Sequence, residues 1–242
     1  NIVQRFGTLG DPDGVNPAFQ TPGNTGIYIP LGASLAGKPT QQISLSGNLS
    51  SLARGPVTQR LATTAPFLAG GLPITASTRL VDLDNNSPSY VLGDRLIIGG
   101  TKSDGSDPDL TELTVDPATT TVGDLLAALN TAFPGATVSL DANGNIEATN
   151  NVPGPSMLNV VISDHPANIG QTGYDLHKLI SQAVGKDGDK VSQGIELYDA
   201  SGGAHSVALE FTKQTDGSWN INATMAAADG SVLDGQVDGI NF

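Results

Sequence analysis

The sequence predicts a mainly β protein. We expect an antiparallel barrel- or sandwich-like domain built from both chain ends, with a small α/β region inserted in the middle. Three observations predict this class. Apolar and polar residues alternate along 195–225, a single capped helix pattern stands at 121–133, and 30 glycines and 15 prolines accompany only 14% charged residues. That composition favours short strands joined by many turns.

The stretch 195–225 predicts three consecutive strands. Its apolar side chains recur at every second position, which places them on one face of a sheet and their polar neighbours on the other. The connection Asp199–Gly203 has two adjacent glycines, and Asp216-Gly217 is a tight-turn signal. The alternating apolar residues are Ile195, Leu197, Val207, Leu209, Phe211, Trp219, Ile221, Ala223 and Met225.

The middle of the chain predicts a helix between strands. Thr121 is an N-cap candidate, with Asp124 three residues later as in a capping box. Pro134-Gly135 ends the helix. A hairpin follows around the turn Asp141–Gly144. Strands are expected around 96–98, 113–115 and 158–162, and the apolar face of the helix comprises Val122, Leu125, Leu126, Leu129 and Phe133.

The length of 242 residues suggests two domains. We expect a discontinuous β-rich domain from residues 1–70 and 176–242, of which 1–40 could belong to a further inner β region. Residues 71–175 form the inserted α/β module. Within the first part, residues 41–49 predict a strand with Ile43, Leu45 and Leu49 facing inward. At 175–184 the pattern suits a helix or a strand, and we favour irregular structure that enters a strand.

Several segments resemble the bacterial flagellar hook protein. The main one is a strand ending in Tyr-Asp, a glycine turn, a histidine, an alternating strand ending in lysine, and a tryptophan. Residues 41–49, with their Gly-Asn-Leu ending, resemble the strand that enters the same outer domain. Residues 26–30 and 1–7 are also similar to hook sequence, and 70–175 are not. The residues that carry the main match are Tyr198, Asp199, Gly202, His205, Phe211, Lys213 and Trp219.

The resemblance implies a structural subunit that polymerises into a curved, flexible tube and transmits motor torque to the filament. It implies export by the flagellar type III apparatus to the outside of the cell, where the basal body and hook assemble. Its partners would be further copies of itself, the distal rod, the hook cap and the hook–filament junction proteins. Hook proteins polymerise through helical terminal segments that this chain lacks, so we expect a core fragment that is monomeric.

Charge and composition exclude several classes of partner. The net charge is −13, with 11 lysines and arginines and no basic cluster, so we expect no nucleic-acid binding and no polybasic membrane contact. No apolar run approaches the roughly 20 residues of a membrane-spanning helix. The absence of cysteine excludes disulfides, thiol catalysis and thiolate metal sites.

The sequence contains no complete catalytic or metal-binding motif: we expect no catalytic, cofactor-binding or metal residue, no cofactor and no enzymatic activity. Asp82-x-Asp84-x-Asn86 begins like a calcium loop, but Ser87 stands where the loop needs glycine. The other acids, at 104, 107, 109, 187 and 189, are typical of solvated turns. The histidines His165, His177 and His205 have no ligand spacing among them.

His205 could be joined with Ser206 and Asp199 as a triad by residue type. A hydrogen bond that fixes the hairpin is the favoured role for His205. Trp219 fits a core position better than a sugar-stacking platform.

Two alternative functions remain open at this point. An extracellular binding module, such as an adhesin or a carbohydrate-binding domain, requires a groove lined by exposed aromatic side chains. A secreted hydrolase requires a carboxylate pair about 5–10 Å apart in a cleft. The glutamates available for such a pair are Glu112, Glu147, Glu196 and Glu210.

Overall fold

The structure is a computed structural model that describes residues 7–9, 19–21 and 38–241. The chain divides into two compact units. One comprises Asn1–Ile43 and Glu196–His205, and the other comprises Ser44–Ile195 and Ser206–Phe242. The segments at 1–6 and 26–30 that resemble hook sequence lie outside the described residues.

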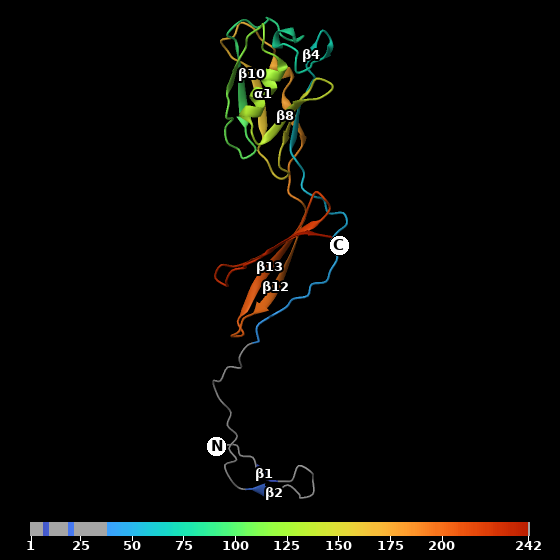
Figure 1. The fold of residues 1–242 in the computed structure, drawn as a ribbon, viewed down its shortest axis with the longest axis vertical. Coiled ribbons are helices and arrows are strands. Elements are labelled where there is room, and N and C mark those ends of the chain that lie inside the picture. Colours follow the sequence, from blue (N-terminus) through green and yellow to red (C-terminus); the bar gives the residue numbers. More distant parts are fainter. Residues whose placement is uncertain (1–6, 10–18, 22–37, 242) are drawn as a thin grey trace. The chain divides into compact units, whose positions relative to one another are not determined.

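The described chain is mainly β, with antiparallel sheets and one α-helix (Figure 1). Glycines and prolines interrupt the sequence so often that most strands are short. The elements are β1 (Gly7–Leu9), β2 (Phe19–Thr21), β3 (Arg60–Thr63), β4 (Leu68–Ala69), β5 (Leu72–Pro73), η1 (Leu80–Asp82), β6 (Arg95–Thr101), β7 (Glu112–Thr114), α1 (Val122–Ala132), β8 (Ala136–Leu140), β9 (Ile146–Asn150), β10 (Asn159–Asp164), η2 (Tyr174–Leu176), β11 (Leu179–Ala183), β12 (Lys190–Tyr198), β13 (Ala204–Lys213), β14 (Trp219–Met225) and β15 (Gln236–Ile240).

All sheets in the described residues are open. Their strand orders are β1-β2, β4-β5, β10-β6-β7, β11-β3-β9-β8 and β12-β13-β14-β15. No sheet in the described part of the chain closes on itself, so the barrel form expected for the β domain is wrong for these residues. The four-stranded sheet of β3, β8, β9 and β11 takes strands from both sides of the boundaries expected near 71 and 175.

Helix α1 forms as the sequence predicts. The backbone N–H of Thr121 donates to Asp124 Oδ2 at 2.8 Å, and the Asp124 N–H donates to Thr121 Oγ1 at 3.3 Å, which completes a capping box. Val122, Leu125 and Leu129 are buried. The helix therefore buries its apolar face in the core of its region.

That core joins α1 to two sheets. Leu96, Ile98, Val160 and Ile162 come from β6 and β10, and they belong to the same buried cluster as the inward residues of β3, β8, β9 and β11. The hairpin β8–β9 is confirmed. Its Gly144 has φ +91°, and a Cβ there would lie 2.4 Å from the Phe67 carbonyl oxygen, so this turn requires glycine.

The strand expected at 41–49 does not form. The described residues from 38 to 50 contain no strand, and Ile43 and Leu45, predicted to face inward, are 43% and 52% exposed. A strand needs a continuous ladder of backbone bonds. The backbone bond from Thr40 N–H to the Tyr198 carbonyl, at 2.9 Å, stands alone beside this segment.

Leu129 tests the central packing role of α1. Its side chain is fully buried, and we expect Leu129→Ala to lower the free energy of unfolding by about 2–5 kcal/mol because it leaves a cavity. Leu92→Ala is the matched control, because Leu92 is exposed, and should change stability by less than about 0.5 kcal/mol. Urea denaturation followed by circular dichroism measures both. Equal effects would contradict the assigned core.

Candidate interaction surface

The sheet β12–β15 has one apolar and one polar face. In its register Val207 lies opposite Met225, Leu209 opposite Ala223, and Phe211 opposite Ile221. Residues paired in this way project from the same side of an antiparallel sheet. The three strands that the alternation predicts are thus confirmed, and the apolar face that they form needs a cover.

That cover is incomplete and leaves a groove. Residues 45–49 line it from one side without forming a strand, and the sheet lines it from the other. The groove has a volume of ≈ 410 Å³. Its lining is largely aliphatic, with a single aromatic ring: Leu45, Ser46, Gly47, Asn48, Leu49, Val191, Gln193, Phe211, Ile221 and Ile240.

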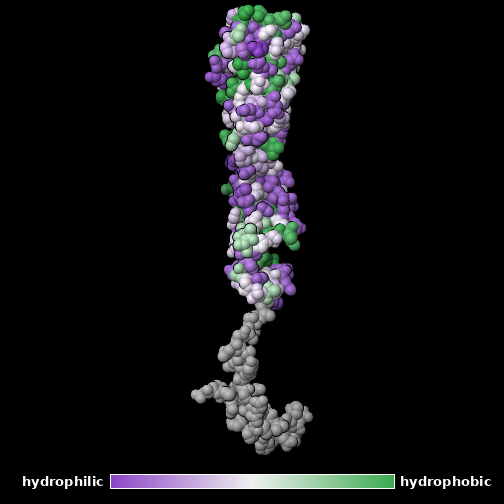
Figure 2. All heavy atoms as spheres, turned by 90° about the vertical axis from the view of Figure 1, so that its left-hand side faces the viewer, coloured by the Kyte–Doolittle hydropathy of each residue, from purple (hydrophilic) through white to green (hydrophobic). Residues whose placement is uncertain are grey.

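The opposite face of the sheet is polar. Lys190 Nζ lies 3.0 Å from Glu210 Oε1 across β12 and β13. On the surface drawn in Figure 2, hydrophilic residues predominate and apolar residues occur in small groups. These surfaces suit contacts that retain water.

Asp199 organises the turn between β12 and β13. Its Oδ1 accepts the N–H groups of Ser201 at 2.8 Å and Gly203 at 2.7 Å, and its Oδ2 lies 3.1 Å from His205 Nε2. Hydrogen bonds from Ser201, His205 and Gly203 lower the pKa of Asp199. The predicted role of His205 in fixing the hairpin is confirmed. Ser206 follows His205 on a strand and therefore projects from the other face, so no triad forms.

The segment Asp82–Asn86, which begins like a calcium loop, makes hydrogen bonds and an ion pair within the protein. Asp84 accepts the N–H groups of Gly70 and Gly71 at 2.6 and 2.8 Å, and Asp82 pairs with Arg79 at 2.9 Å. Asn86 is buried. Within the described ranges, no cluster of three or more histidines or acids could hold a metal ion.

The remaining candidate residues are dispersed. His177 stacks on Phe67 with ring centroids 4.0 Å apart, and His165 Nδ1 accepts the Ala167 N–H at 3.1 Å. Trp219 is buried beneath Lys213, as the core assignment predicts. The glutamates have separate partners: Glu112 pairs with Arg95, Glu147 with Arg60 and Glu210 with Lys190, while Glu196 hydrogen-bonds Tyr198.

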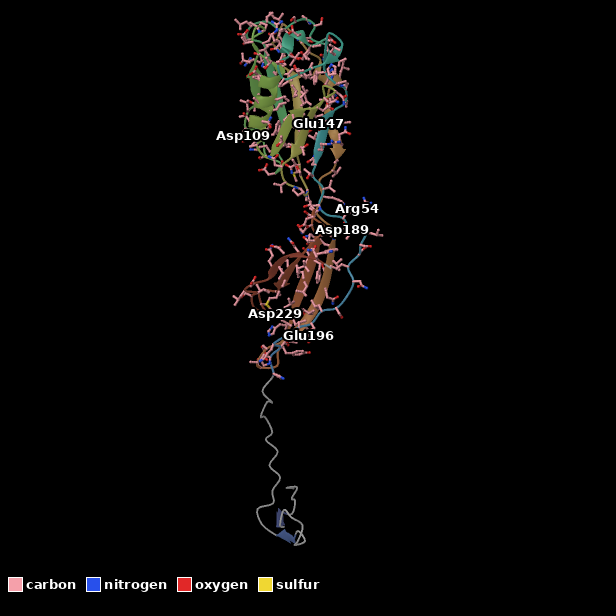
Figure 3. The ribbon with its side chains drawn as sticks, turned by 45° about the vertical axis from the view of Figure 1, so that its right-hand side comes forward. Arg54, Asp109, Glu147, Asp189, Glu196 and Asp229 are labelled. Atoms are coloured by element: carbon pink, nitrogen blue, oxygen red, sulfur yellow. The ribbon has the colours of Figure 1, made fainter. Side chains whose placement is uncertain are left out.

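Two aspartates have structural roles that the sequence did not indicate. The first is Asp189, which was expected to be a solvated turn residue but binds backbone groups of distant residues. Its Oδ2 accepts the Arg54 N–H at 2.7 Å, its own N–H donates to the Arg54 carbonyl at 2.9 Å, and its carbonyl accepts the Lys213 N–H at 3.0 Å. Figure 3 labels Arg54 and Asp189, which lie next to each other. Arg54 lies 135 residues away along the sequence, so no local motif could indicate this junction.

The second aspartate is Asp94, which is buried. Burial by itself raises the pKa of Asp94, but N–H donors from Val91, Ile169 and Gly170 outweigh this effect, and the pKa is lowered. The carboxylate thereby ties two loops together. Ile169 is 75 residues from Asp94, so the only sequence signal is the turn residue Gly93 before it.

Comparison with protein-family models, with curated proteins and with solved structures finds no match to this chain. In the part of the chain that the structure describes, no helix has the length and apolarity to span a membrane.

The tight junction around Asp189 predicts that Gly188 cannot be replaced. A Cβ on Gly188 would lie 2.0 Å from the Lys213 carbonyl oxygen, so Gly188→Ala should lower the free energy of unfolding by about 1–3 kcal/mol. Gly194→Ala is the control, because a Cβ there meets nothing within 4 Å. Urea denaturation of both variants checks this, and a neutral Gly188→Ala would contradict the close approach.

Asp199 predicts a pH dependence of the β12–β13 turn. Its folded pKa lies below the unfolded value of about 3.9, so its stabilising effect is present above that pH and is lost as the pH falls through the folded pKa. Hydrogen exchange of the Ser201 and Gly203 amides should therefore accelerate at low pH, relative to the intrinsic rate. Asp199→Asn should abolish this extra dependence, and a carboxyl titration at the ordinary pKa would contradict it.

Proposed function

We propose that this chain is the outer-domain core of a bacterial flagellar hook subunit, a structural protein that acts by assembly rather than by catalysis. In the assembled state, copies form a curved tube that bends while it transmits torque from the motor to the filament. The proposal includes export by the flagellar type III apparatus to the outside of the cell. Its further partners are the distal rod, the hook cap and the hook–filament junction proteins.

One observation carries the proposal: the residues that resemble hook sequence occur in order on a single β meander. Tyr198 ends β12, the Asp199 turn and His205 follow, and Trp219 begins β14. Of the matched residues, Gly202 donates its N–H to the Asp199 carbonyl at 3.1 Å, and His205 Nε2 lies 3.1 Å from Asp199 Oδ2. The matched residues thus work together in shaping one hairpin, which supports a shared origin for the pattern.

The finer architecture also belongs to this proposal. Residues 1–70 and 176–242 would form the discontinuous hook-type β domain, sandwich-like with its neighbours, and 71–175 the inserted α/β module. The described boundaries of β3 and β11 favour an insert that also includes those two strands, because both pair within the same sheet as β9 and β8.

The mechanism follows from stiffness within a subunit and weak adhesion between subunits. Three hydrogen bonds link Asp189 to Arg54 and Lys213, and we propose that they stiffen the subunit locally. Outward positions are mostly polar, as in the Lys190–Glu210 pair. Polar, hydrated contacts slide at lower cost than an interlocked apolar interface, which lets one side of a tube shorten while the other lengthens.

The alternative is an extracellular binding module. The groove beside residues 45–49 has the volume for a small ligand. Phe211 is its one aromatic side chain and is half-buried, whereas carbohydrate recognition favours exposed aromatic faces. The assembly hypothesis therefore remains the stronger.

The proposed function is tested by assembly of a complete hook subunit that contains this chain, here called the parent chain. Sedimentation and negative-stain microscopy should reveal curved tubes for the parent chain, whereas the 242-residue chain should sediment as a monomer. A parent chain that never polymerises, together with tight binding of a glycan by the 242-residue chain, would sink the hook proposal in favour of a binding module.

A further inference from the structure

Two sheets in the region of α1 end beside each other without pairing. β10 is the edge of the sheet β10-β6-β7, and β11 is the edge of the sheet β11-β3-β9-β8. A groove of ≈ 380 Å³ separates them. It is lined by residues 159–163 of β10, residues 177–180 at the start of β11, and Tyr174 and Asp175.

Where β10 and β11 come closest, the gap between them is narrower than one additional strand requires. Cα atoms of β10 and β11 approach to within 8 Å over part of their length, and no backbone hydrogen bond joins the two strands in the described structure. Paired strands lie about 4.8 Å apart, so two strands that flank a third lie about 10 Å apart. The closest Cα atoms are therefore nearer than an inserted strand allows, and a strand enters there only when the two edges move apart.

The exposed edges define what could bind there. Residues 159–163 and 179–182 donate and accept backbone bonds to β6 and β3, and their other edges make no further backbone bonds within the described residues. Val160, Ile162 and Leu179 point into the core, whereas Val161 and Ile180 are 45% and 47% exposed. A fitting strand must alternate, with apolar side chains toward the core and polar side chains outward.

The same chain carries a segment of that kind that is not used as a strand. Residues 41–46 read Gln-Gln-Ile-Ser-Leu-Ser, with Ile43 and Leu45 on one side of an extended chain and Gln42, Ser44 and Ser46 on the other. The segment forms no strand, and Ile43 and Leu45 remain about half exposed. Leu45 lines the groove beside the sheet β12–β15, so insertion elsewhere requires the segment to leave that face.

We propose that residues 41–49 of a second copy insert as a strand between β10 and β11. The insertion converts the two sheets into one continuous sheet and covers the exposed edges. This inference rests on the proposed function, because a polymer holds neighbouring copies at the millimolar effective concentrations that a short strand requires. At low concentration the free chain stays monomeric.

A peptide with the sequence of residues 41–49 tests the acceptor site directly. Added at millimolar concentration to the isotope-labelled 242-residue chain, it should shift the amide resonances of 159–163 and 179–182 and slow their hydrogen exchange. The matched control peptide carries Ser44→Pro and Ser46→Pro, which keep Ile43 and Leu45 but remove two backbone donors. It should bind at least about tenfold more weakly, because pairing depends on the ladder.

Three results would overturn the inference. The first is that the amide resonances of β10 and β11 do not change. The second is that both peptides bind equally well, and the third is that only residues of the groove at Phe211 and Ile221 respond. Tube assembly by the parent chain without peptide binding removes this inference and leaves the proposed function. Peptide binding without tube assembly removes the proposed function and leaves the acceptor site.

Cross-linking tests the donor in the whole chain, which has no native cysteine. Ser44→Cys chains mixed with Ile180→Cys chains at high concentration under air should form disulfide-linked heterodimers, because outward side chains on neighbouring strands lie within disulfide reach. Leu72→Cys replaces Ile180→Cys in the control, since Leu72 is exposed on β5. Equal yields from the two mixtures would contradict strand insertion.

Discussion

The backbone of a strand has hydrogen-bonding groups on both edges, and an edge without a partner must be covered, charged or left in water. Every sheet in the described chain is open, so this constraint recurs throughout the structure. β12 has Lys190 and Glu196 along its edge, and β15 has Asp238 and Gly239, residues that discourage indiscriminate pairing. The edges at β10 and β11 have fewer charges, and we propose that a specific partner strand pairs with them.

The faces of the sheets follow the same logic. Around α1 the apolar faces of two sheets meet the helix and form a buried core, with Leu129 and Phe133 fully enclosed. The sheet β12–β15 has no helix of its own, and residues 45–49 cover its apolar face only in part. Contacts with neighbouring copies would cover this face further if the chain works in a polymer, as we propose.

The sequence predicted the elements that are determined by residues close together along the chain. Helix α1, its capping box, the hairpin β8–β9 and the strands β12–β14 all follow from periodicity and turn residues within short windows. The segment 41–49 shows the limit of such patterns: its alternation predicts a strand, but a strand also needs a paired edge, which the sequence does not reveal. The barrel form failed for the same reason.

The site was less predictable than the fold. Asp199 and His205 stand six residues apart, so their hydrogen bond was foreseeable from the hairpin. Asp94 and Asp189 bind backbone groups that lie 75 and 135 residues away, and nothing in their immediate sequence distinguishes them from turn acids. Long-range contacts of this kind come only from the three-dimensional structure.

The central claim is that neighbouring copies complete the open edges and the partly covered face of this chain. Hydrogen exchange, compared between the free chain and the polymer that we propose it belongs to, tests it most directly. The account predicts added protection in residues 41–49, β10 and β11, and little change in α1, which is already buried. Identical exchange of these edges in the free and assembled states would contradict it.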